Sequence, residues 1–264
     1  FSLIQLIALA ILWHDPGIAR RIRYPALVIL AASVLASGSK TGLLTLLILL
    51  VWRVFLTIFA SPSQGRYVSP YRAVLVGVAI CLPILVVVVM LDESIRMSMV
   101  AGLDRIPTLS RLTPLLLDFE TGIAADGSGR DSAWLNAMPI IGLFPLAGVG
   151  VGTYLGIAAQ FSDEPVLAHN TYLQIAAEWG LVFSGIFLVW VGILLLRRPS
   201  PGANMSLWNS SRDALLVLLI GSAGISLQNA RLLWLFIGMV LAVHLFSRVR
   251  QPVQQQPLAQ EVQP

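Results

Sequence analysis

Long apolar runs separated by short polar segments dominate this chain. A helix needs about 20 apolar residues to cross a bilayer. Because lipid offers the backbone no hydrogen-bond partner, helices are favoured over isolated strands within such runs. The pattern therefore predicts an all-α, polytopic transmembrane helical bundle with about seven spans, at residues 1–13, 22–37, 41–60, 73–91, 171–196, 214–228 and 232–246.

The composition supports a membrane protein. Charged residues make up 11% of the chain and apolar residues 57%, whereas soluble domains are about 25% charged. The net charge of +4 does not indicate a nucleic-acid partner, because the basic residues lie in short segments between predicted spans. The single cysteine, Cys81, excludes an intrachain disulfide, and no two histidines have metal-ligand spacing. We predict no metal and no cofactor.

Four regions follow from the pattern. Residues 1–91 are predicted to form transmembrane helices, residues 92–170 a large periplasmic loop, and residues 171–247 further transmembrane helices. Residues 248–264 are rich in Gln and Pro, so a disordered cytoplasmic tail is expected. Because the chain opens inside an apolar run, we expect its first span to be truncated and earlier spans to precede it.

The positive charges decide how the spans are counted and oriented. Residues 22–60 form either one long bent helix or two spans, and the flanking segments 14–23 and 61–72 are both basic. Two spans with a tight turn at 37–40 put both basic segments in the cytoplasm, as the positive-inside rule requires. The long 92–168 loop then lies outside, which is the periplasm if the membrane is a bacterial inner membrane.

The long outer loop contains two recognisable patterns. Residues 132–141 read as a short amphipathic helix that Ser132 caps and Pro139 limits. Residues 145–154 carry three alternating glycines, Gly148, Gly150 and Gly152. Because no surrounding strand and helix complete a nucleotide-binding unit, these glycines indicate a turn where backbone approaches a ligand or another helix.

Five ionisable groups are expected near the outer surface and could share one cavity: Lys40, Arg130, His169, Glu178 and Arg231. Cations hold a diphosphate, and a histidine can accept a proton from a hydroxyl at neutral pH. The group therefore suits a lipid carrying a diphosphate-linked sugar.

Each of these residues also has a structural interpretation. His169 can be a hydrated residue at the start of a helix, at the membrane interface. Lys40 and Arg231 can extend their side chains to the lipid headgroups. Glu178 lies nine residues after His169, about half a turn away, so a direct bond between them is not expected. Glu178 is instead either catalytic or orients an arginine of a neighbouring helix. The remaining histidines, His14 and His244, are interpreted as membrane-boundary residues.

Three motifs resemble the C-terminal part of the O-antigen ligase and polymerase superfamily. The first is His169-Asn170, nine residues, then Gly180, with Tyr172, Leu173 and Glu178 in family-like places. The second runs from Gly129-Arg130 through Trp134 and Ala137 to the segment 145–150, and the third is the segment 37–42 that opens a span. Two positions differ from the family pattern, because Lys40 stands where arginine is usual and Phe183 where Gly, Thr or Tyr is usual.

The resemblance implies an inverting glycosyl transfer at the periplasmic side of the membrane, without metal or nucleotide sugar. The donor would be an undecaprenyl-diphosphate-linked glycan, and the acceptor lipid A–core or another glycan. It implies that His169 is the general base and that Arg130 and Lys40 bind the diphosphate, with Asn170, Tyr172, Glu178 and Gly180 supporting the site. Arg231 joins the diphosphate-binding group from topology alone.

Three functional hypotheses remain at this point. A ligase is slightly preferred to a polymerase of the same superfamily, and attachment of the glycan to protein is a further possibility. A transporter of a lipid-linked or anionic solute would place charges near the bilayer midplane and show internal repeats, which this sequence does not. A non-catalytic scaffold would tolerate loss of His169.

Overall fold

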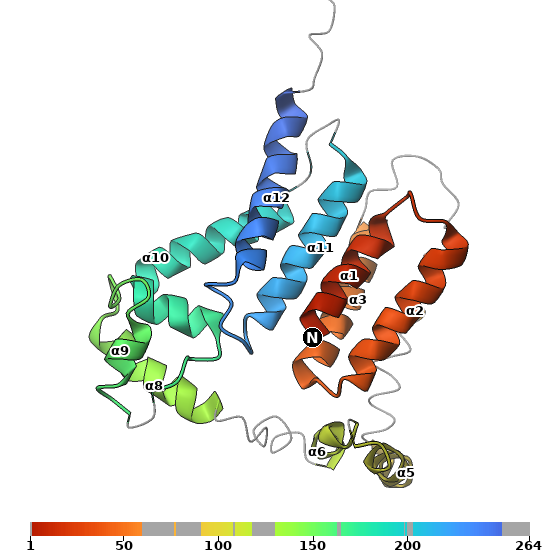
Figure 1. The fold of residues 1–264 in the computed structure, drawn as a ribbon, viewed down its shortest axis with the longest axis horizontal. Helices are drawn as coiled ribbons and strands as arrows, with labels where there is room; N and C mark the ends of the chain where they lie inside the picture. Colours follow the sequence, from red (N-terminus) through yellow and green to blue (C-terminus); the bar gives the residue numbers. More distant parts are fainter. Residues whose placement is uncertain are drawn as a thin grey trace, which may run out of the picture.

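All regular elements in the described part of the chain are helical, as predicted (Figure 1). The computed structural model describes residues 2–59, 77, 91–107, 109–117, 130–162, 165–197, 199 and 203–249. The elements in chain order are α1 (Ser2–His14), α2 (Arg20–Ala36), α3 (Lys40–Phe59), α5 (Glu93–Asp104), η1 (Ser110–Leu112, a short 3-10 helix), α6 (Thr113–Leu117), α8 (Arg130–Leu143), α9 (Tyr154–Ala158), α10 (Thr171–Leu196), α11 (Met205–Gly221) and α12 (Arg231–Val249).

The predicted spans correspond closely to observed helices. The segment 22–60 forms two helices, α2 and α3, with a turn around Gly38 at a φ of 60°. The predicted span 171–196 coincides with α10, the one described helix long and apolar enough to cross a membrane. The predicted span 73–91 lies outside the described residues except for residues 77 and 91. The total number of spans and the boundaries of the four regions therefore stay predictions.

One predicted span is misplaced. We expected a helix over 214–228, but α11 begins at Met205 and ends at Gly221. Asn204 caps its start, with its side-chain oxygen accepting from the Leu207 N–H at 3.1 Å. The polar residues that follow in the second turn, Ser210, Ser211 and Arg212, are buried, so tertiary packing stabilises a helix start that hydropathy does not show.

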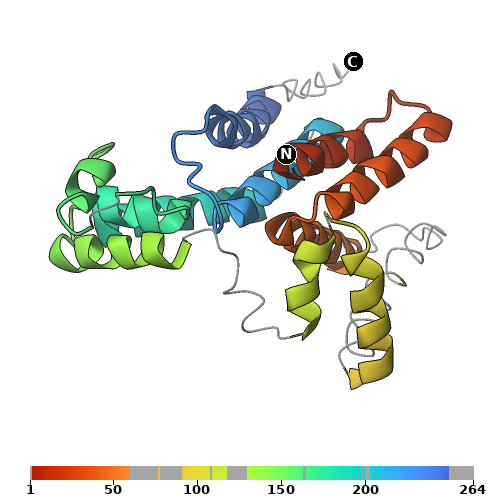
Figure 2. The same cartoon turned by 60° about the horizontal axis from the view of Figure 1, so that its bottom comes forward.

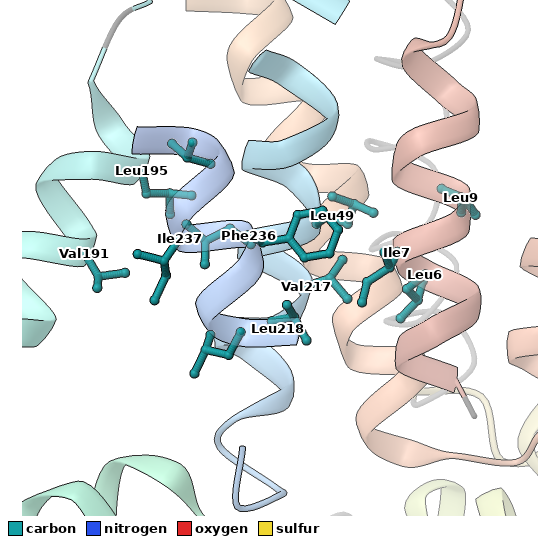
Figure 3. Packing of buried hydrophobic residues seen from close by; sticks show 14 of the residues in the cluster. Leu6, Ile7, Leu9, Leu49, Val191, Leu195, Val217, Leu218, Phe236 and Ile237 are labelled. Carbon is teal, nitrogen blue, oxygen red and sulfur yellow. The ribbon is translucent and has the colours of Figure 1, made fainter. Parts of the chain in front are cut away.

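Most of the helices form two packed groups, while α5, η1 and α6 pack against one another outside both (Figure 2). The larger core joins α1, α2, α3, α11, α12 and the second half of α10. In Figure 3 the ring of Phe236 reaches from α12 into the middle of this core, near Leu49 of α3 and Val217 of α11. The smaller core holds α8 and α9 against the first half of α10 through Ile140, Tyr154 and Ala177.

A buried ion-pair cluster joins three helices of the larger core. The Asp213 carboxylate of α11 is 1% exposed and pairs with the Arg53 guanidinium of α3. The same carboxylate oxygen lies 3.2 Å from Nε2 of His14 at the end of α1, and Arg53 also contacts that ring. His14 therefore does more than mark a membrane boundary. The other predicted boundary histidine, His244, is buried with its ring 6.2 Å from that of Trp208.

Replacing Asp213 with asparagine should destabilise the bundle by about 3–5 kcal/mol, because the Arg53 guanidinium would then be largely buried without a compensating negative charge. Thermal unfolding of the purified protein in detergent measures this loss. Glu93→Gln is the control, since Glu93 is an exposed carboxylate on α5. Equal melting temperatures for the two variants would show that the cluster does not stabilise the fold.

Candidate functional site

The helix start that carries Lys40 lies at the end of the bundle where α1 begins. The hydroxyl of Ser2, the first described residue, donates to that of Ser39 at 3.2 Å. The same end of α1 packs against the end of α11, since a Cβ on Gly221 would lie 2.6 Å from the side chain of Leu3. The starts of α1 and α3 and the end of α11 are thus neighbours, at the lower end of the bundle in Figure 1.

His169 and Arg231 come to this same end. The residue after the end of α11, Ser222, accepts a 2.8 Å hydrogen bond from the Thr171 N–H at the start of α10. Arg231 begins α12, directly after the connector 222–230 that follows α11. The helix starts that carry Lys40, His169 and Arg231 therefore lie at one end of the bundle. A cavity shared by the five predicted residues stays a prediction.

His169 stands just outside its helix. Its φ of 48° is left-handed, a region that histidine adopts more readily than most residues. Asn170 caps α10, with its side-chain oxygen accepting from the N–H groups of Tyr172 and Leu173 at 2.9 and 3.2 Å. The helix therefore begins at Thr171, and His169, two residues before it, is exposed.

Arg130 is the first residue of α8, and its side chain lies outside the described part of the structure. The helix predicted at 132–141 is present, but two details of that prediction are wrong. Ser132 lies inside the helix and does not cap it, and Pro139 does not end it. The helix continues to Leu143 because Ala137 and Ile140 are buried against α9 and α10.

α10 is broken at Gly180, where φ is 77° and ψ is 165°. Figure 1 shows its two parts meeting at a sharp bend beside α8 and α9. A break of this kind frees backbone groups that a continuous helix would pair, and these groups need partners in an apolar environment.

The glycine-rich segment 145–152 supplies those partners. The N–H groups of Val149 and Gly150 each donate at 2.9 Å, to the carbonyls of Ala177 and Glu178 respectively. After the break, the Leu181 N–H donates to the Pro145 carbonyl at 2.6 Å. The expected approach of glycine backbone to another helix is confirmed, and the helix that it approaches is α10.

Two glycines make this approach possible. A Cβ on Gly148 would lie 2.4 Å from the carbonyl atoms of Glu178, and a Cβ on Gly180 would lie 2.3 Å from the Leu146 carbonyl oxygen. Both residues also have positive φ, at 66° and 77°. The final glycine of the His-Asn motif and the glycine-rich motif are therefore two sides of one contact.

Glu178 strengthens the same contact. Its carboxylate is 2% exposed and accepts at 3.1 Å from the Gly152 N–H and from the Gln174 side-chain amide. The ion pairs found in the described residues include none between Glu178 and an arginine, so the structure gives that expected role no support. Burial and the nearby Glu178 carboxylate raise the pKa of Tyr154 to about 12.

The tyrosine of the His-Asn motif has a structural contact. The Tyr172 hydroxyl donates to the Leu219 carbonyl near the end of α11. Sequence reasoning missed the neighbouring Thr171, whose hydroxyl bonds the α11–α12 connector. A buried threonine gives no distinct signal in an apolar run, so only the fold identifies it.

Comparison with known proteins adds one match. The family model described as O-antigen ligase matches residues 25–189, more than half of the chain. The matched range contains Lys40, Arg130 and His169, together with the glycine contact at the break in α10, while Arg231 lies beyond it. No curated protein and no solved structure matches the chain.

Alanine at Gly148 or Gly180 should destabilise the protein by at least about 2 kcal/mol, because each Cβ meets backbone and each φ is left-handed. Gly185→Ala and Gly192→Ala are matched controls in α10 with open space around the new Cβ. They should gain about 0.5–1 kcal/mol from the better helix former. Thermal unfolding in detergent compares the two pairs, and similar shifts in both would contradict the close contact.

Proposed function

This chain belongs to the O-antigen ligase family, which comprises O-antigen ligase and polymerase glycosyltransferases of the membrane; on that basis we propose that it is a ligase. The glycan moves from an undecaprenyl-diphosphate carrier to a sugar hydroxyl of lipid A–core. The reaction takes place on the periplasmic side of a bacterial inner membrane.

The observation that carries the proposal is the exposed imidazole of His169 at the start of α10, at the same end of the bundle as Lys40 and Arg231. His169 takes the proton from the acceptor hydroxyl as the hydroxyl oxygen forms the new bond to the anomeric carbon of the donor sugar. The bond from that carbon to the diphosphate oxygen breaks in the same displacement, so the configuration inverts. The proton ends on the imidazole, and the bonding electrons leave with the diphosphate.

The cations have distinct parts in this reaction. Negative charge grows on the departing diphosphate, and positive groups fixed nearby stabilise it more in the transition state than in the ground state. Arg231 and Arg130 each present a planar fork that donates two parallel hydrogen bonds to phosphate. Lys40 contributes a point charge and donors without that fixed geometry.

The outer face of the second half of α10 suits the lipid part of the donor. Large apolar side chains on this face are exposed, as expected where acyl or prenyl chains cover the protein. Phe183 is one of them, at 61% exposed, so its difference from the usual ligase pattern lies on the outer face of the helix. The others on this segment are Leu181, Val182, Ile186, Val189, Trp190, Ile193 and Leu196.

The first test is complementation of a bacterial host that lacks its own O-antigen ligase. The wild-type protein should restore polymer on lipid A–core, and His169→Asn should abolish it. Asparagine is the substitution of choice because it tolerates the left-handed backbone of residue 169 while lacking a basic nitrogen. Gel analysis of lipopolysaccharide measures the product.

Expression of both forms in the membrane is verified by immunoblot as the control. A His169→Asn protein that restores polymer at normal expression excludes the general-base role. If wild type restores nothing in this host, the same pair is tested in a host lacking its O-antigen polymerase. Restored chain length there would assign the chain to the polymerase branch of the family.

Arg231→Gln should lower transfer by about a hundredfold to a thousandfold, the effect of removing one charge-stabilising donor group. Arg197→Gln is a matched control, because Arg197 is also exposed but lies at the other end of α10. Both variants are measured for polymer on lipid A–core in the complemented host. Equal activity in the two would remove Arg231 from the diphosphate site.

A further inference from the structure

One buried side chain connects the helix start beside His169 to the connector that leads to Arg231. Thr171 is 2% exposed, and its hydroxyl donates to the Ile225 carbonyl and accepts from the Leu227 N–H, both at 2.7 Å. Its N–H donates to the Ser222 carbonyl at 2.8 Å. Three hydrogen bonds from one residue thus hold the connector 222–230 against the start of α10.

The connector is bonded in turn to the first turn of α12. The Ala230 N–H donates to the Leu227 carbonyl at 2.8 Å. The indole N–H of Trp234 donates to the Gln228 carbonyl at 2.7 Å. A continuous set of hydrogen bonds therefore runs from Thr171 through the connector to the helix that begins with Arg231.

His169 has few other means of being held in place. Its side chain is exposed, and between it and Thr171 only Asn170 intervenes, whose side chain caps α10 itself. The position of the imidazole relative to the Arg231 guanidinium therefore depends on how the start of α10 is fixed to the connector. The Thr171 hydroxyl provides both a donor and an acceptor for that purpose.

We propose that Thr171 is a positioning residue for glycosyl transfer, which sets the distance between the His169 base and the Arg231 cation. This inference rests on the proposed function. The acceptor hydroxyl and the leaving diphosphate lie on opposite sides of the anomeric carbon in an inverting displacement. The base and the cation must consequently be held at a fixed separation, and misplacement by about 1 Å can cost a hundredfold in rate.

The test compares Thr171→Val and Thr171→Ser in the full-length protein. The assay uses an undecaprenyl-diphosphate-linked glycan as donor and lipid A–core as acceptor. Valine keeps the shape of threonine and loses the hydroxyl, whereas serine keeps both hydrogen bonds. Thr171→Val should lower kcat by about tenfold to a hundredfold, and serine should restore most of that loss. Thr45→Val is the control, since Thr45 is equally buried but its hydroxyl bonds only the Thr41 carbonyl of its own helix.

Combination with Arg231→Gln separates positioning from a general loss of stability. If Thr171 acts by placing the connector and Arg231, the double variant should be no slower than the slower single variant. Amide hydrogen exchange at Leu227 should also accelerate in Thr171→Val and stay unchanged in Thr45→Val.

Each outcome of this experiment is decisive. Three results would overturn the inference while the ligase assignment stands. The first is a Thr171→Val variant with the kcat of the wild type, and the second is a Thr171→Ser variant as slow as Thr171→Val. The third is a double variant whose loss of kcat is the product of the two single losses. A wild-type protein without transfer activity, or an active wild type in which His169→Asn is silent, would overturn the proposed function and this inference with it.

Discussion

The backbone at the break in α10 has to find hydrogen-bond partners, and the candidate site is organised around that requirement. In lipid an unpaired N–H or carbonyl costs several kcal/mol. Here the segment 145–152 pairs with residues 177–181 on both sides of Gly180. The pairing requires glycine at 148 and 180, and the Glu178 carboxylate adds a side-chain bond to Gly152. A long loop and a membrane-length helix thereby form one structural unit.

The first half of α10 is fixed at both of its ends. Thr171, Gln174 and Glu178 are three and four residues apart, so they share one buried face of the helix. Thr171 bonds the α11–α12 connector at one end, and Glu178 bonds the glycine segment at the other, with Gln174 donating to Glu178 between them. This segment, residues 171–178, therefore aligns two parts of the chain that are distant in sequence, and His169 lies two residues before it.

Local patterns predicted the helical elements well, and non-local contacts limited the prediction of the site. The bounds of α10 and the turn at Gly38 follow from apolar run lengths and charge placement. The start of α11 was missed because the polar residues of its second and third turns are buried by tertiary packing, and Asp213 among them pairs with partners on α1 and α3. The long-range partner of Glu178 was likewise hidden, since it is the backbone N–H of Gly152, 26 residues away, which no side-chain pattern reveals.

The break also sets how far α10 can reach across a bilayer. The straight segment 181–196 rises about 24 Å, less than the roughly 30 Å thickness of the hydrocarbon core. A membrane that meets this shorter segment has to thin locally or admit the bent part of the helix below its headgroups. The break at Gly180 thus makes the fit between α10 and the bilayer dependent on the thickness of the membrane.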